Sequence, residues 1–147
     1  MTATGHAIIG TIIAAKVGNP TLAIPLAIVS HFLMDTIPHW DIATHRKEKT
    51  KSNLILEAFS DVLLGFILSF LILVFLFPQT SPTYAFLMIL VSQSPDWLTA
   101  PYYFFGIKEF KWAYKLQKFF DKELDKPWGI INQIALLISI LIIAKLF

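Results

Sequence analysis

The sequence predicts an all-α fold, a polytopic membrane helical bundle with about five transmembrane or membrane-embedded helices and one interfacial amphipathic helix. Hydrophobic residues make up 56% of the 147 residues, and charged residues only 15%, against about a quarter in soluble domains. The mean hydropathy is +0.65. The apolar residues also fall into long runs separated by short polar loops. We expect a single membrane domain over residues 1–147.

The first two expected helices cover residues 3–17 and 20–37, separated by the turn GNP. At about 1.5 Å per residue the first is about 22 Å long, which is short for a hydrocarbon core of roughly 30 Å. This helix is therefore tilted, partly re-entrant or shielded by its neighbours. Pro25 is expected to kink or break the second helix.

Three later helices are expected at residues 54–77, 82–98 and 129–147. The first of these is the clearest span, because its length of about 36 Å exceeds the hydrocarbon core. The second is shorter and is bounded by prolines. The third follows Pro127, a residue that favours the start of a helix.

The positions of the basic residues predict an orientation. Of the 12 Lys and Arg residues, four lie in HRKEKTK and six lie between residues 108 and 126, which leaves Lys16 and Lys145 for the opposite face. The positive-inside rule then places the N-terminus and both basic loops in the cytoplasm. We expect a multi-pass protein of the inner (cytoplasmic) membrane. The first residues carry no basic region, so we do not interpret them as a cleaved signal peptide.

Residues 107–125 are expected to form the interfacial helix. Lysines recur there at steps of three and four, at Lys108, Lys111, Lys115, Lys118 and Lys122. Aromatic residues and leucines occupy the rest of the circumference, a pattern typical of a helix drawn to anionic headgroups. The alternative is a solvated cytoplasmic connector. We expect membrane lipids as partners and no nucleic acid, and the sequence leaves oligomerisation open.

Ionisable residues gather where the expected helices meet the cytoplasmic side. Because consecutive helices alternate in direction, groups far apart in the sequence reach the same level: His6, His31, Asp35, His39, Asp41, Glu57, Asp61 and Asp96. His31 with Asp35, and Glu57 with Asp61, are spaced by four residues and so share a helix face. Ionisable groups within membranes face a bundle interior or a cavity rather than lipid.

So many carboxylates and imidazoles repel one another unless protons or cations compensate them, and a bound metal ion is the simplest counter-charge. The chain has no cysteine, which removes disulfides, thiolate ligands and cysteine nucleophiles. Imidazole nitrogen with carboxylate oxygen suits zinc best, and also manganese or iron. Two such ions can bridge through a shared aspartate. The expected metal ligands are His6, His31, Asp35, His39, Asp61 and Asp96.

Asp41 and Glu57 are the candidate catalytic residues, as a general base or as hydrogen-bond partners of a ligand. Each site residue also has an ordinary interpretation. His31 with Asp35 can be a hydrogen-bonded pair at a helix end, Glu57 can face headgroups, and Asp96 can end a helix. Their joint position favours a metal or proton site.

Three stretches, TGHAIIGTIIAAK, SHFLMDTIPHWD and SPDWLTAPY, resemble the small, predicted membrane-bound metal-dependent hydrolases of bacteria and archaea, a group that includes LexA-regulated members. The H-x3-D-x2-P-H core is also similar to the histidine–aspartate motif of zinc-dependent phospholipase C. The resemblance implies a helical membrane protein in which His31, Asp35 and His39 are metal ligands, joined by His6 and Asp96. The larger family carries a further aspartate two residues after its Pro-Asp motif, where this chain has Leu98.

Together these patterns predict a membrane-embedded metal-dependent hydrolase that acts on a phosphoester, such as a lipid headgroup, at the cytoplasmic interface. Two alternatives stay open. One is a protein that binds or transports a metal ion or protons through the same groups. The other is a structural membrane protein in which a metal only staples helix ends together. Metal content, followed by hydrolysis assays, separates the three.

Overall fold

The structure, a computed structural model, describes residues 1–147 and is all-α, as the sequence predicts. Two short 3-10 helices, η1 (Arg46–Glu48) and η2 (Lys108–Phe110), lie in the loops. The six α-helices are α1 (Ala3–Lys16), α2 (Pro20–Asp35), α3 (Lys51–Leu76), α4 (Pro82–Phe105), α5 (Lys111–Phe120) and α6 (Trp128–Leu146). The five long helices begin and end within a few residues of the predicted bounds, except that α4 continues beyond residue 98 to Phe105.

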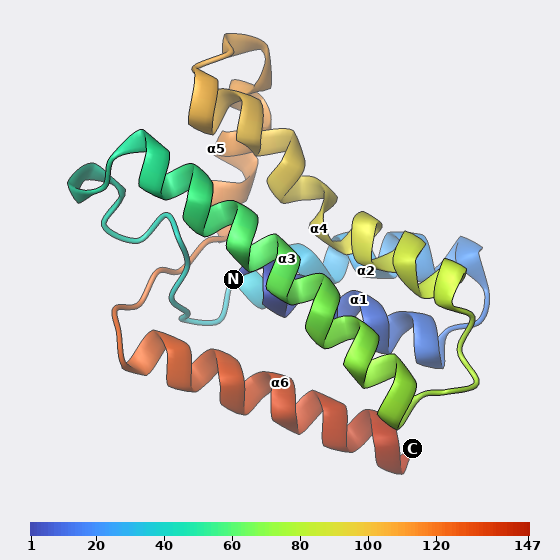
Figure 1. Cartoon of the computed structure of the whole chain (residues 1–147). Coiled ribbons are helices and arrows are strands. Elements are labelled where there is room, and N and C mark those ends of the chain that lie inside the picture. The colour runs from blue at the N-terminus through green and yellow to red at the C-terminus, as the bar shows by residue number, and fades with distance from the viewer.

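The short helix α1 is the centre of the fold. It packs against α2, α3, α4 and α6 and lies behind α3 in Figure 1. Every residue from Gly5 to Ala14 is buried, so of the three arrangements expected for a short first helix, shielding by neighbours is the one observed. Gly10 permits the closest approach, since a Cβ there would lie 2.7 Å from the carbonyl oxygen of Met88 in α4.

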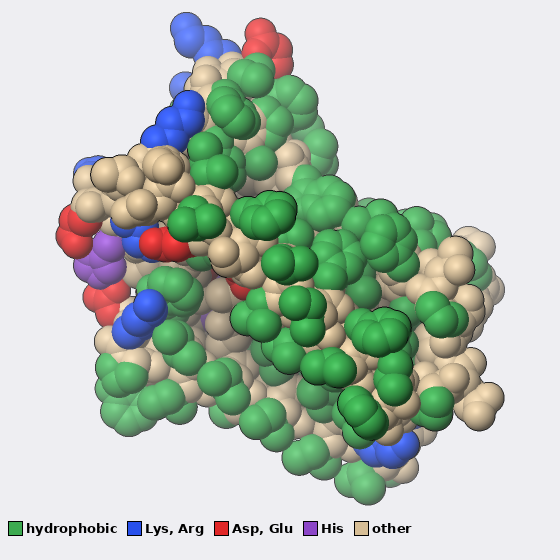
Figure 2. Space-filling view, in the orientation of Figure 1, with side chains coloured by type: hydrophobic (Ala, Val, Ile, Leu, Met, Phe, Trp, Pro, Cys, Tyr) green, Lys and Arg blue, Asp and Glu red, His purple; other side chains and the backbone are tan.

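Two helices, α3 and α6, are long and apolar enough to cross a membrane, with mean hydropathies of 2.5 and 2.1 over their most apolar windows. Most of their large apolar side chains face outward, such as Phe59, Phe70 and Phe75 in α3 and Ile142 in α6. Figure 2 shows hydrophobic side chains over much of one face, with most of the charged ones at one end. A water-soluble protein rarely exposes so large an apolar surface, so the exposed surface fits a lipid environment.

Proline does not end α4 where the sequence predicted, and it does not interrupt α2. Pro25 lies inside α2 without breaking it, and Pro95 and Pro101 both lie inside α4. Each proline removes one backbone hydrogen bond, and Figure 1 shows α4 changing direction along its length. Because α4 packs against α1, α2 and α5, tertiary contacts hold a helix that local preference would end at residue 98.

The amphipathic segment is shorter than predicted. Instead of one helix over residues 107–125, η2 is followed by the ten-residue α5, and residues 121–125 leave the helix. The reason is pairing with another part of the chain. The amide of Lys122 donates to the carbonyl of Asp35, and a parallel bridge joins His39 to Glu123. This pairing places the segment after α5 beside the end of α2.

The two remaining basic residues lie together at the end of the bundle opposite the basic loops. Lys145 donates to the carbonyl of Leu76 at 2.9 Å. Lys16 and Lys145 both lie over the ring of Phe77, at 5.6 and 5.9 Å from its centroid. The ends of α1, α3 and α6 therefore meet, as expected for helices that alternate in direction.

Candidate metal centre

Four ionisable side chains are buried together where the start of α1 meets the end of α2. His6 comes from α1, His31 and Asp35 from α2, and His39 from the loop after it. Each of the four is at most 1% exposed. Removing such groups from water is costly unless they are hydrogen-bonded, paired or bound to a metal. Their partners therefore decide what the cluster can do.

The first group of possible ligands is formed by His6, His31 and Asp96. The rings of His6 and His31 stack, with centroids 3.7 Å apart. The Nδ1 of His31 lies 2.8 Å from the carbonyl oxygen of Ser92. A carbonyl oxygen only accepts, so Nδ1 donates and the lone pair of His31 is on Nε2. A histidine held in this way presents Nε2 as a metal ligand.

Asp35 lies against both of these rings. His6 Nε2 is 3.2 Å from Asp35 Oδ1, and His31 Nε2 is 3.5 Å from Asp35 Oδ2 and 3.7 Å from Asp96 Oδ1. The ligand atoms of a tetrahedral zinc site lie roughly 3.4 Å apart, because zinc–nitrogen and zinc–oxygen bonds are about 2.0–2.2 Å long. The observed separations are close to this value.

Three of these five atoms have no hydrogen-bond partner, whereas Asp35 Oδ1 and Asp96 Oδ1 accept from Met1 and Gln117. His6 Nε2, His31 Nε2 and Asp35 Oδ2 are all buried and unpaired. Buried polar atoms in folded proteins are nearly always paired, so each exception needs an explanation. A cation bound beside these three neighbouring atoms would explain all three exceptions.

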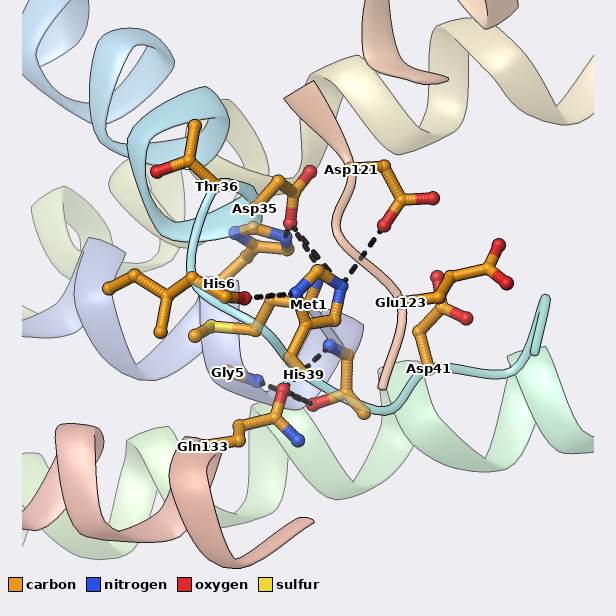
Figure 3. A network of polar contacts seen from close by, with 12 residues as sticks. Met1, Gly5, His6, Asp35, Thr36, His39, Asp41, Asp121, Glu123 and Gln133 are labelled. Atoms are coloured by element: carbon orange, nitrogen blue, oxygen red, sulfur yellow. Dashed lines mark hydrogen bonds and ion pairs between the residues drawn. The ribbon is translucent and has the colours of Figure 1, made fainter. Parts of the chain in front are cut away.

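The second group is formed by His39, Asp41 and Asp121. His39 Nδ1 lies 2.8 Å from the carbonyl oxygen of Ile37, and Nε2 lies 3.3 Å from Asp121 Oδ1. Asp121 follows α5 directly, and Figure 3 shows its carboxylate directed toward the His39 ring. Asp41 accepts hydrogen bonds from the amide and hydroxyl of Thr44 at 2.9 and 3.0 Å.

The α-amino group of Met1 also lies in the cluster, in contact with Asp35 and His39. The start of the chain is held by Gln133 of α6, whose Oε1 accepts from the amide of Thr2 at 2.9 Å. A positive group therefore lies against the carboxylate of Asp35. Its position indicates where this cluster attracts positive charge.

Outside the helices, the pKa values of three groups are shifted. Burial raises the pKa of Asp41, and the charge of Asp121 nearby raises it further. Burial alone would raise the pKa of Asp121, but the His39 ring and the Lys118 ammonium outweigh it and hold that pKa below its usual range. Hydrogen bonds to Asp125 and Glu48 raise the pKa of the exposed His45.

Three of the expected residues belong to neither group: Asp35, which lies against both of them, and Asp61 and Glu57, which have other partners. Asp61 accepts from the backbone amides of Ala3 at 2.7 Å and Thr4 at 3.2 Å. Its carboxylate thus satisfies the first amides of α1, which have no partners within the helix. Glu57 is paired with Lys49, with Oε2 and Nζ 2.7 Å apart.

A pocket of about 840 Å³ opens beside the second group. Trp40 and Thr44 lie on one wall, and Glu57 and Asp61 of α3 lie on the other. Lys126 lies 3.9 Å from the centroid of the Trp40 ring, and Lys49 lies 5.5 Å from it. Through the Thr44–Asp41 hydrogen bond, the pocket wall contacts the cluster directly. The lining also holds four carboxylates, from Glu48, Glu57, Asp61 and Asp125, so positive and negative side chains both face this pocket.

Asp121 is the site residue that sequence reasoning did not find. It was placed within an interfacial helix, because FFDKEL continues the spacing of the lysines. No local signal connects it with His39. Their proximity depends on the backbone pairing of residues 121–124 with the loop after α2.

No protein-family model, curated protein or solved structure matches this chain. The resemblance to membrane-bound metal-dependent hydrolases therefore stays a prediction from the sequence.

Proposed function

We propose that this protein is a membrane-embedded metal-dependent hydrolase that cleaves a phosphoester, such as a lipid headgroup, at the membrane interface. The observation that carries the proposal is a group of three neighbouring buried ligand atoms without hydrogen-bond partners, His6 Nε2, His31 Nε2 and Asp35 Oδ2, beside the Asp96 carboxylate. With Asp96, these side chains supply two imidazoles and two carboxylates. That set fits zinc first, then manganese or iron.

When bound, such a metal lowers the pKa of a coordinated water and polarises a phosphoryl oxygen. The chain's own residues hold the ligands in place. Ser92 fixes the His31 ring through its carbonyl oxygen, and its hydroxyl donates to the carbonyl of His6 at 2.8 Å. One residue of α4 therefore holds the His31 ring and the backbone of His6.

The pocket beside the cluster is the proposed substrate site. Lys49 and Lys126 provide positive charge around Trp40 for a phosphate group. Asp41 lies between the cluster and the pocket wall, and we assign it as the proton acceptor for the attacking water. Glu57, the other catalytic candidate, pairs with Lys49 on the pocket wall, so its role here is to orient that lysine.

The membrane placement is also a proposal. The spans α3 and α6 and the apolar outer surface support a bundle with about five membrane-embedded helices and a cytoplasmic N-terminus. Trp112, Leu116 and Phe119 of α5 are exposed, among lysines that favour anionic headgroups. α5 would then lie in the interface and keep lipid substrates near the pocket.

Metal analysis and hydrolysis assays on the full chain in detergent test the proposal. We expect zinc in the purified protein and phosphate release from an anionic phospholipid in mixed micelles. His31→Gln should lower both zinc affinity and turnover by more than about 100-fold, since even substitutions around a ligand cost 10–100-fold. His45→Gln is the matched control for zinc affinity and should leave it unchanged, because His45 pairs with Glu48 and Asp125 and contacts neither group of ligands.

Two results would overturn this function. A wild-type protein that binds no transition metal would remove every metal-based interpretation. A protein that binds zinc and unfolds more readily without it, yet hydrolyses no phosphoester, would favour the structural alternative. That second candidate has its own support, because the cluster joins α1, α2 and α4 to the segment after α5.

A further inference from the structure

His39 is the one buried histidine that is not a ligand of the first metal position. It is fully buried, and its Nδ1 is occupied by the carbonyl oxygen of Ile37, so the Nε2 lone pair faces the cluster. That nitrogen lies 3.3 Å from Asp121 Oδ1 and 4.0 Å from Asp35 Oδ1. These separations are again those of atoms that can share one metal ion.

We propose that the centre binds two divalent ions, the second held by His39, Asp121 and Asp35, with the Asp35 carboxylate bridging the two positions. This inference rests on the proposed function for the first position and adds a second one. Its new ligand, Asp121, comes from the segment after α5.

The two carboxylate oxygens of Asp121 have different surroundings, and one of them is free to bind a metal ion. Its Oδ1 is buried and has no hydrogen-bond partner, whereas Oδ2 pairs with Lys118 Nζ at 2.9 Å. The backbone holds the two ligands in register. The amide of His39 donates to the carbonyl of Lys122 at 3.0 Å, and the amide of Leu124 donates to the carbonyl of His39 at 2.7 Å. Asp121 therefore has one oxygen fixed by a lysine and the other directed at His39.

Asp35 has the geometry of a bridge. Its Oδ2 lies 3.5 Å from His31 Nε2 of the first group, and its Oδ1 lies between the groups, 3.2 Å from His6 Nε2 and 4.0 Å from His39 Nε2. In two-metal sites the ions lie about 3.5–4 Å apart, a distance that the two oxygens of one carboxylate can span. The single buried carboxylate between the two groups is thus enough to join them.

The two positions differ in how many protein ligands they offer. The first has four, from His6, His31, Asp35 and Asp96, so an ion there binds water only by becoming five-coordinate. The second has three, and catalytic zinc sites keep an open position for water beside three protein ligands. The open position would face Asp41 and the pocket wall at Thr44. The second ion is therefore the one that meets substrate.

The α-amino group of Met1 occupies this region in the structure, in contact with Asp35 and His39. It places positive charge against the two residues that would hold the second ion. Binding of that ion requires the first residue to withdraw. The amino group and the second ion are thus competitors for one position, and this gives the proposal a sharp alternative.

The test uses the full chain in detergent, reconstituted with Mn²⁺. We expect two Mn²⁺ per chain by elemental analysis and an exchange-coupled signal by electron paramagnetic resonance. Asp121→Asn should bind one Mn²⁺ and give the spectrum of an isolated ion, because it loses only the second position. Asp125→Asn is the matched control on the same segment. Its carboxylate is exposed and pairs with His45, so it should keep both ions and the coupled signal.

The outcomes separate this inference from the proposed function. One uncoupled ion per wild-type chain would leave the first position intact and overturn the second, with the Met1 amino group in its place. Two coupled ions in Asp121→Asn would overturn the assignment of Asp121. No bound ion in the wild type would overturn both proposals. The wild-type measurement decides the number of ions even if Asp121→Asn fails to fold.

Discussion

The chain has four histidines, and His45 differs from the other three in how its ring is satisfied. His6, His31 and His39 are buried, and the Nδ1 atoms of His31 and His39 are held by backbone carbonyls. His45 is about half exposed, and both of its nitrogens face carboxylates, Glu48 at 3.2 Å and Asp125 at 2.6 Å. The exposed histidine forms ordinary ion pairs, whereas His6 and His31 present Nε2 atoms without hydrogen-bond partners to shared carboxylates, and His39 Nε2 contacts the Met1 amino group.

This contrast shows what distinguishes a candidate ligand from an ordinary histidine. Both regions combine imidazole with carboxylate, so residue type alone does not separate them. Exposed ion pairs contribute little to stability, and water can replace either partner. In the buried cluster water does not reach His6 Nε2 or His31 Nε2, so the ring nitrogens need either a proton or a metal.

The largest effect is expected for Asp35→Asn, which removes the only carboxylate that faces both groups of ligands. Metal binding should fall below detection at micromolar zinc. With zinc present in both samples, the free energy of unfolding of Asp35→Asn should be about 3 kcal/mol or more below that of the wild type, because buried charges lose their partner. Elemental analysis and thermal unfolding in detergent measure the two effects. Retained stoichiometric zinc would show that Asp35 is not a ligand.

A smaller effect is expected for Gly10→Ala, which places a Cβ 2.7 Å from the carbonyl oxygen of Met88 and against the Ser92 hydroxyl. The change should push α1 from α4 and cost about 1–3 kcal/mol through overpacking. It should also weaken zinc binding, since Ser92 positions both His6 and His31. Gly18→Ala is the control, because a Cβ at Gly18 meets nothing within 4 Å. Equal stability of the two variants would contradict the close contact.

Asp61→Ala should reduce stability by about 1 kcal/mol, the typical cost of losing an acceptor at a helix N-terminus. It should leave the zinc content unchanged, because the Asp61 carboxylate binds the amides of Ala3 and Thr4. Thermal unfolding and elemental analysis on the same sample measure both quantities. Loss of bound zinc without loss of stability would instead make Asp61 a metal ligand, as the sequence predicted.

Asp61 also illustrates the limits of the sequence. The hydrophobic runs located the helices, and helices that alternate in direction place Asp61 at the same end of the bundle as His6, His31 and Asp35. The structure confirms this placement. The sequence pattern does not distinguish a metal ligand from a carboxylate that accepts hydrogen bonds from the first amides of α1, since both roles need a carboxylate near a helix end. The difference depends on which face of α3 meets the start of α1, a matter of packing.

Asp121 shows the opposite limit. The spacing of the lysines predicted a helix through residue 125, whereas α5 ends at Phe120. The competing interaction, backbone pairing with His39, joins segments far apart in the sequence and has no local pattern. Likewise, Pro101 gave a local stop signal that packing of α4 against α5 and α2 overrides. Periodicity therefore predicted the elements, and contacts between elements decided the second half of the site.

The smallest effect concerns pH, and here the two regions should respond in opposite directions. Hydrogen bonds to Asp125 and Glu48 raise the pKa of His45 above 6.5. Its ion pairs are therefore fully formed below pH 6.5 and are lost as the pH rises through the folded-state pKa. Metal ligands must be deprotonated, so the buried cluster should instead release zinc as the pH falls. Asp125→Asn should lower the His45 pKa, measured by NMR titration of its ring protons, without moving the pH at which zinc is released. A common shift of both midpoints would mean that His45 is coupled to the centre, and the contrast between the exposed and the buried histidines would then fail.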